Sequence, residues 1–236
     1  MNTEPYCRLH LFFATENSQA VILRQGPSKT FRMILWDRDT DRFEDGQWLK
    51  HKVYAERCDI SPDGRHFIYF ALDGRWGSEA KGSYTAISRP PYFTALALFP
   101  QGDTWGGGGV FIDTTRYVAD GDKDIIGQAT GLSRLSRVEP SAECPSGLRT
   151  PKGACVRLSK AKALRAHQTT PGQHPDLSKY DTKGGKLWRR RGQELTLIRD
   201  FTDMAFEPIT APYDTRPRGS SEMAPMPWHP LDRDGS

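Results

Sequence analysis

The feature that most constrains the fold is the regular change between apolar runs and turn-forming residues over residues 34–72. A β-forming apolar run at 33–36 is followed by DRDTD at 37–41, whose Asp and Thr side chains bond to nearby backbone and favour a turn. Asp45-Gly46 predicts a hairpin turn, because both residue types tolerate a positive φ. The stretch therefore predicts short antiparallel strands with tight connections.

A second turn signal follows at residues 61–64, which read Ser-Pro-Asp-Gly. Pro62 presets φ for the turn, and Gly64 supplies the left-handed residue that returns the chain into a strand. The run HFIYF at 66–70 is almost wholly apolar or aromatic, so we expect a strand that is covered on both faces and central in its sheet.

Residues 60–69 resemble the SPDG-plus-strand signature of WD40-like (TolB-type) β-propeller blades. The resemblance covers residues 34–72 and implies a blade-like antiparallel meander. A complete propeller needs about four or more blades of about four strands each, whereas this chain shows one clear blade. The segments RQGPSK, SPDG, SRPP and WGGGG also resemble an uncharacterised bacterial protein family, which implies no function.

The remaining strand candidates are short and closely spaced, which favours an antiparallel meander. They lie at residues 6–14, 20–25, 29–36, 83–88, 93–99, 110–112, 186–188 and 194–198. The predicted class is all-β, a meander of blade-like hairpins arranged as an incomplete propeller or a sandwich.

Composition divides the chain into four parts. Residues 1–132 form the first part of a β-rich domain, 133–183 a basic and partly disordered insertion or linker, 184–213 the strands that complete the sheet, and 214–236 a disordered tail. Residues 132–200 hold 15 Lys and Arg against 6 Asp and Glu, whereas residues 1–131 hold 15 against 17. The positive charge is therefore concentrated in the middle of the chain, where residues 155–167 could form a short basic helix.

The sequence shows no apolar run near the length of a transmembrane helix, about 18 residues. Its start lacks the basic-then-apolar pattern of a signal peptide. We therefore expect a cytoplasmic protein with no membrane partner.

The four cysteines are Cys7, Cys58, Cys144 and Cys155, and none forms a CxxC pair. Without a signal peptide we expect reduced thiols rather than a disulfide framework. A zinc site built from Cys144, Cys155, His167 and His174 has spacings that fit no common finger or ribbon. The acidic stretch at 120–124 lacks the remaining ligands of a calcium loop. No metal and no cofactor is expected.

Sequence motifs do not favour an enzyme. GxSxG, HExxH, Walker A and Rossmann patterns are missing from the sequence. Ser88 precedes Arg89 and a proline pair rather than opening a strand–turn–helix elbow. A hydrolase with its site between Arg89 and Asp113 is the weaker alternative.

The favoured interpretation is a binding or interaction module that presents loops on a β-sheet scaffold, with an unknown protein or small molecule as its partner. The candidate ligand-binding residues are Arg89, Tyr92, Trp105, Gly106 and Gly107, which could form one rim. Four consecutive glycines cost ordering entropy, which is tolerated where backbone approaches a ligand closely, with Trp105 as a stacking lid. The alternative is a flexible hairpin tip.

The second interpretation is a nucleic-acid-associated protein that uses the basic segment 149–191. Arg189, Arg190 and Arg191 would contact phosphates, and Trp188 would stack on a base. The alternative is a solvated charged face. The oligomeric state does not follow from the sequence.

Overall fold

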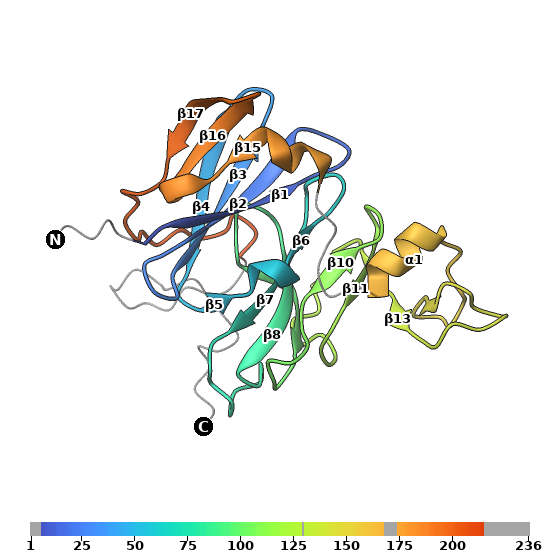
Figure 1. Ribbon diagram of the computed structural model, residues 1–236. Helices are drawn as coiled ribbons and strands as arrows, with labels where there is room; N and C mark the ends of the chain where they lie inside the picture. The colour runs from blue at the N-terminus through green and yellow to red at the C-terminus, as the bar shows by residue number, and fades with distance from the viewer. Residues whose placement is uncertain (1–5, 129, 168–173, 215–236) are drawn as a thin grey trace.

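The structure is a computed structural model that describes residues 6–128, 130–167 and 174–214. It confirms the all-β class: antiparallel hairpins dominate, and the described residues form a single α-helix (Figure 1). The described part of the chain contains no helix with the length and apolarity that crossing a bilayer requires.

The first sheet, sheet A, is a four-stranded antiparallel meander in the order β1-β2-β3-β4. Its strands are β1 (Arg8–Phe13), β2 (Gln19–Gln25), β3 (Phe31–Asp37) and β4 (Arg42–Leu49). Apolar side chains alternate along β2: Val21 and Leu23 belong to one buried layer, and Ala20 and Ile22 belong to another. Sheet A is therefore covered on both faces, as its apolar strands require.

The second sheet, sheet B, is also antiparallel, with the order β5-β7-β8-β9, and β6 pairs with β7 as well. Its elements are β5 (Lys52–Val53), β6 (Asp59–Ile60), β7 (Phe67–Leu72), β8 (Ser83–Ser88) and β9 (Ala95–Pro100), with the 3₁₀ turn η1 (Ala55–Arg57) between β5 and β6. The first five residues of β7 are buried and the strand is central, which confirms the prediction made from HFIYF.

Three smaller sheets follow. Sheet C contains β10 (Gly109–Phe111), β11 (Arg116–Ala119) and β12 (Ser133–Arg134), sheet D contains β13 (Ser136–Arg137) and β14 (Leu148–Arg149), and sheet E contains β15 (Tyr180–Asp181), β16 (Lys186–Arg191) and β17 (Glu194–Asp200). Between them lie α1 (Lys160–His167), η2 (Pro175–Lys179) and η3 (Lys183–Gly185).

The sheets stack face to face in the order E-A-B-C (Figure 1). Leu187 and Phe201 of the sheet E region pack on Trp36 of sheet A, and Tyr69 of sheet B shares a layer with Met33 of sheet A. Sheet C packs on the far face of sheet B, and a fourth layer joins sheet C to β14 and α1. The last sheet of the chain therefore covers the first.

The turn at residues 61–64 forms as predicted. Gly64 has φ +74° and donates its N–H to Ser61 O at 2.9 Å, and the Ser61 hydroxyl lies 2.6 Å from Asp63 Oδ1. The stretch 34–72 is nevertheless not one sheet, because β3 and β4 belong to sheet A while β6 and β7 belong to sheet B. The blade resemblance stays a prediction.

The predicted hairpin turn at Asp45-Gly46 is wrong. Both residues lie inside β4, and the chain reverses earlier, where Asp41 has φ +54°. A Cβ on Gly46 would lie 1.9 Å from Pro91 O, so the glycine is needed for close packing of sheet A on the Pro90-Pro91 loop. A contact distant in sequence explains this glycine, rather than a turn.

Residues 133–183 are more ordered than expected where they are described. They contribute β12, the β13–β14 hairpin, α1 and β15. The strands of 184–213 form sheet E with β15 and do not complete sheet A. Nearly all of the predicted tail, residues 215–236, lies outside the described residues.

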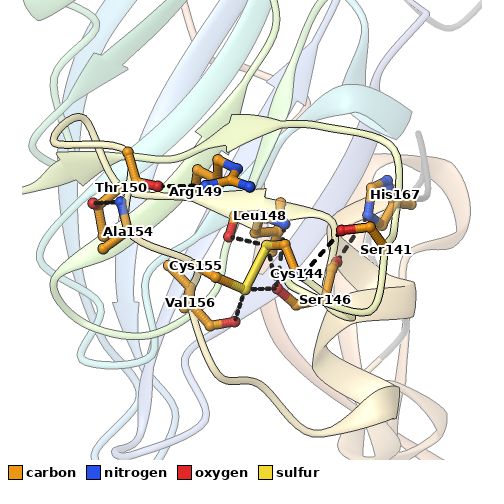
Figure 2. Close-up of a disulfide and its surroundings, with 11 residues drawn as sticks. Ser141, Cys144, Ser146, Leu148, Arg149, Thr150, Ala154, Cys155, Val156 and His167 are labelled. Atoms are coloured by element: carbon orange, nitrogen blue, oxygen red, sulfur yellow. Dashed lines mark hydrogen bonds between the residues drawn. A yellow bond between two sulfur atoms is a disulfide. The ribbon is translucent and has the colours of Figure 1, made fainter.

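The expectation of reduced thiols is wrong for one pair, because Cys144 and Cys155 form a disulfide with a Cα–Cα distance of 5.3 Å (Figure 2). The bond closes a loop that contains β14. The Ser146 hydroxyl lies beside the disulfide, 3.8 Å from Cys144 Sγ and 3.7 Å from Cys155 Sγ, and accepts the Leu148 N–H at 3.2 Å. Cys7 and Cys58 are free. Sequence spacing alone does not show that a turn brings residues 144 and 155 together.

Candidate ligand-binding cleft

A cleft of about 1040 Å³ opens along the edge strand β1. Its walls are the whole of β1, the segment from η1 to the turn after β6, Arg165 of α1, and the segment from His174 through η2 to β15. In Figure 1, β1 and β6 lie near the middle of the view with β15 above them, although the sequence separates these strands widely, and α1 lies further to the right. We call this site the β1 cleft.

The strand β1 forms one wall and is largely uncharged. Leu9 and Phe13 are buried in the layer between sheets A and E, while the Phe12 ring packs edge-on against Phe67 of sheet B at a centroid distance of 5.1 Å. His10 Nε2 lies 3.0 Å from Gln25 Oε1, and burial lowers the pKa of His10. His10 is therefore neutral at pH 7 and offers a polar but uncharged edge.

An ion pair joins two other walls: its carboxylate, Asp59, is buried, whereas the Arg165 side chain is 35% exposed. Arg165 Nη2 donates to both carboxylate oxygens of Asp59 at 2.9 Å, and the Phe111 N–H donates to Asp59 Oδ2 at 2.8 Å. Burial raises the pKa of Asp59 to about 6, against the opposing effect of the Arg165 charge. At pH 7 the pair is ionised, and it ties α1 to β6 and β10.

The opposite wall is aromatic and rigidly held. His174 precedes η2, and its Nδ1 accepts the Asp176 N–H at 3.1 Å. The Phe13 ring packs against both His174 and Tyr180 at 5.5 Å. Burial is the main cause of the lowered pKa of His174. Arg38 binds Asp176 at 3.0 Å, which fixes η2 to sheet A.

The predicted rim does not form. Arg89 and Tyr92 lie before β9, where the Tyr92 hydroxyl donates to Glu44 at 3.2 Å. Trp105 comes after β9, at the other end of a strand about 20 Å long, and is 93% exposed. Residues close in sequence are thus placed at opposite ends of sheet B. Ligand contact by either group stays a prediction.

Close packing explains much of the glycine run at residues 106–109, which follows Trp105. Gly107 has φ +95°, and a Cβ there would lie 2.2 Å from the Phe70 ring. Arg57 donates to the carbonyls of Thr104 and Gly106. The backbone of Gly106 and Gly107 therefore approaches the protein's own side chains closely.

The arginine triplet is partly neutralised. Arg189 binds Asp41 at 2.8 Å and Arg190 binds Asp181 at 2.6 Å, so of the three arginines Arg191 is the exposed one without an ion pair among the described residues. The Trp188 indole donates to Lys183 O at 3.5 Å. These pairs reduce the charge that is free to contact phosphate, and the nucleic-acid interpretation stays an untested alternative.

The segment between Arg89 and Asp113 shows no prepared nucleophile among its described neighbours. Ser88 Oγ is buried without a hydrogen-bond partner, and Asp113 is held by Arg116 Nε at 2.7 Å. The described residues contain no group of three or more His, Cys, Asp or Glu placed to hold a metal ion.

Sequence reasoning missed the β1 cleft. Asp59 and Arg165 are 106 positions apart and meet only because α1 returns to the first strand of sheet B. Tyr180 lies in the segment 133–183, which the sequence predicts to be an insertion. The one available signal is the position of Asp59 between Cys58 and Ile60, directly before the predicted turn at 61–64, since a charged residue among buried neighbours needs a partner.

Fold and site together define an all-β protein of stacked, mostly antiparallel sheets with a cleft at an open sheet edge. No family model matches this chain, and neither a curated protein nor a solved structure matches it.

Proposed function

We propose that this chain is a binding module, cytoplasmic as its sequence suggests, that holds a ligand in the β1 cleft. The observation that supports this most is the cleft itself, whose volume of about 1040 Å³ is at the upper end for small-molecule sites. Its walls combine apolar side chains with nearly as many polar and charged ones, so the cleft offers a ligand both hydrophobic contact and hydrogen-bonding groups.

The polar groups near the cleft suit recognition. The Asp59–Arg165 pair is fixed at 2.9 Å, His10 is neutral, and His174 is held by its backbone partner. A site with rigid walls loses little conformational entropy when a ligand binds. The cleft thus replaces the loop rim as the preferred ligand site.

The test uses a library of small organic fragments as the probe. Fragment binding to the full chain is followed by ligand-observed NMR, and hits are mapped on the amides of β1. The variant Ala55→Trp places an indole on the cleft wall and should abolish the hits, whereas Ala154→Trp, at an exposed position outside the cleft, should leave them unchanged. Hits that survive Ala55→Trp, or no hits at all, would contradict the proposal.

Cytoplasmic location needs its own test, since a disulfide such as Cys144–Cys155 is more typical of an oxidising compartment. Thiols counted by mass spectrometry after rapid alkylation in intact cells should number four in a cytoplasmic protein. Two free thiols would argue for an oxidising location.

A further inference from the structure

We propose that the β1 cleft binds an extended peptide segment of another protein, which adds to sheet A as a new strand along the free edge of β1. The inference rests on the proposed function and names its ligand class. The main-chain groups of β1, the other edges of the large sheets, and the walls of the cleft support it independently.

The backbone of β1 presents a regular row of unpaired groups. Ala14 donates its N–H to Gln19 O at 2.9 Å, and the β1–β2 register is unbroken from Arg8↔Gln25 to Phe13↔Ala20. In an antiparallel pair alternate residues face the partner strand, so Phe12, His10 and Arg8 face β2.

Leu9, Leu11 and Phe13 therefore turn their N–H and C=O groups away from β2, and all three residues line the cleft. Their main-chain groups have no hydrogen-bond partner in the described part of the chain. The row repeats about every 6.8 Å, the spacing at which an added strand pairs.

The other long edges of sheets A and B are covered. On β4, the Gln47 N–H donates to Pro91 O at 3.0 Å. On β9, Leu98 O accepts from the Ile125 N–H at 3.0 Å, and the Leu98 N–H donates to Asp124 at 2.8 Å. Proteins normally protect long edges with proline, bulges or covering loops. The strand β1 contains no proline and no bulge over its six residues, and no segment among residues 6–128, 130–167 and 174–214 hydrogen-bonds to its free edge.

The shape of the cleft suits one strand. An added strand lies about 4.8 Å from its neighbour, and the cleft along β1 is bounded on its other side by η2, β15 and Arg165, which a further strand beyond the first would meet. The groove is closed at one end, because the Thr15 and Glu16 N–H groups both donate to Pro62 O, at 3.1 and 2.9 Å. A single extended peptide is therefore the occupant, rather than a second copy of this chain.

The side chains of the cleft define the peptide further. A residue opposite Leu11 would point into the layer that holds Leu177 and Tyr180, both partly buried and apolar. A residue opposite His10 would point toward Glu56 and the surface. We expect apolar side chains at alternate positions of the ligand, the pattern used when strand addition selects its partner.

The experiment selects random dodecapeptides displayed on phage against the immobilised full chain and measures the affinity of synthetic hits by fluorescence anisotropy. Each backbone nitrogen of a hit is then methylated in turn. Strand addition predicts that methylation at every second peptide position lowers the affinity about tenfold or more, because a buried main-chain group would lose its partner. Methylation at the positions between them should change the affinity little. Losses without this period of two would overturn the proposal.

A matched pair of variants tests the protein side. Leu11→Pro removes a donor that faces the groove and no β1–β2 hydrogen bond, whereas Leu11→Ala shortens the side chain and keeps the donor. Leu11→Pro should lower the affinity for the peptide by at least about tenfold more than Leu11→Ala does. Equal effects would overturn the proposal.

The remaining outcomes separate this inference from the proposed function. Fragment hits in the cleft without any enriched peptide would overturn strand addition alone. A dimer in sedimentation that Leu11→Pro abolishes would make the occupant a second copy and also overturn it. If Leu11→Pro does not fold, the methylated peptides still decide the question.

Discussion

The substitution Asp59→Asn tests the electrostatics of the β1 cleft most directly. Asp59 is 5% exposed, and its burial raises the pKa from 3.8 to about 6 although Arg165 stands beside it. The folded protein therefore holds a proton between about pH 4 and 6 that the unfolded chain has released. A group of this kind stabilises the fold at low pH, and its contribution is lost as the pH rises through 6.

The expected size follows from the two pKa values. Each pH unit between them is worth about 1.4 kcal/mol, so the free energy of unfolding of the wild type should lose about 2 kcal/mol from this group between pH 4 and 7, where pH 4 lies just above the unfolded pKa. Asp59→Asn removes the titration. The difference in unfolding free energy, variant minus wild type, should thus rise by about 2 kcal/mol over this range.

Urea unfolding at pH 4, 5, 6 and 7 measures how this difference in unfolding free energy changes with pH. Any stability that Asp59→Asn loses equally at every pH, because Arg165 is left unpaired, does not affect that change. The control is Asp122→Asn: the hydrogen bond from Lys81 lowers the pKa of this exposed carboxyl, so its slope should be flat or opposite in sign. A flat or falling difference for Asp59→Asn would refute the reasoning, since it would mean that Arg165 outweighs desolvation.

Three further outcomes are expected. Gly46→Ala should destabilise the fold by about 1–3 kcal/mol in urea unfolding, because its Cβ would clash with Pro91 O; an unchanged midpoint would contradict the close packing. Cys155→Ser should cost up to about 3 kcal/mol by releasing the loop closed with Cys144, and a reductant should have the same effect on the wild type but none on the variant. Trp105→Ala should change stability by less than about 0.5 kcal/mol because the side chain is exposed, and a larger thermal shift would show packing that the structure lacks.

Local patterns predicted the strands well. The β-forming runs at 20–25 and 83–88 and the turn at 61–64 are present in the structure, since short-range chemistry decides them. The class and the central position of β7 followed from the same signals.

Contacts between distant residues account for the errors. Gly46 serves a contact with Pro91, and Cys144 meets Cys155 through a turn that the spacing does not reveal. The cleft depends on how the sheets stack, and local sequence patterns do not determine the stacking order. The sequence predicts a short basic helix that includes Arg165, but it does not show that the acidic partner of Arg165 lies 106 positions earlier.

The packing of sheet E on sheet A has a consequence for folding. Arg24 of β2 donates from Nε to Phe201 O at 3.0 Å, a contact that spans 177 positions. During synthesis, one face of sheet A stays uncovered until nearly the whole described chain has emerged. Such non-local closure slows folding, and we expect the apolar side chains of Ile34 and Trp36 to be a chaperone-binding surface of the nascent chain until β16 and β17 arrive.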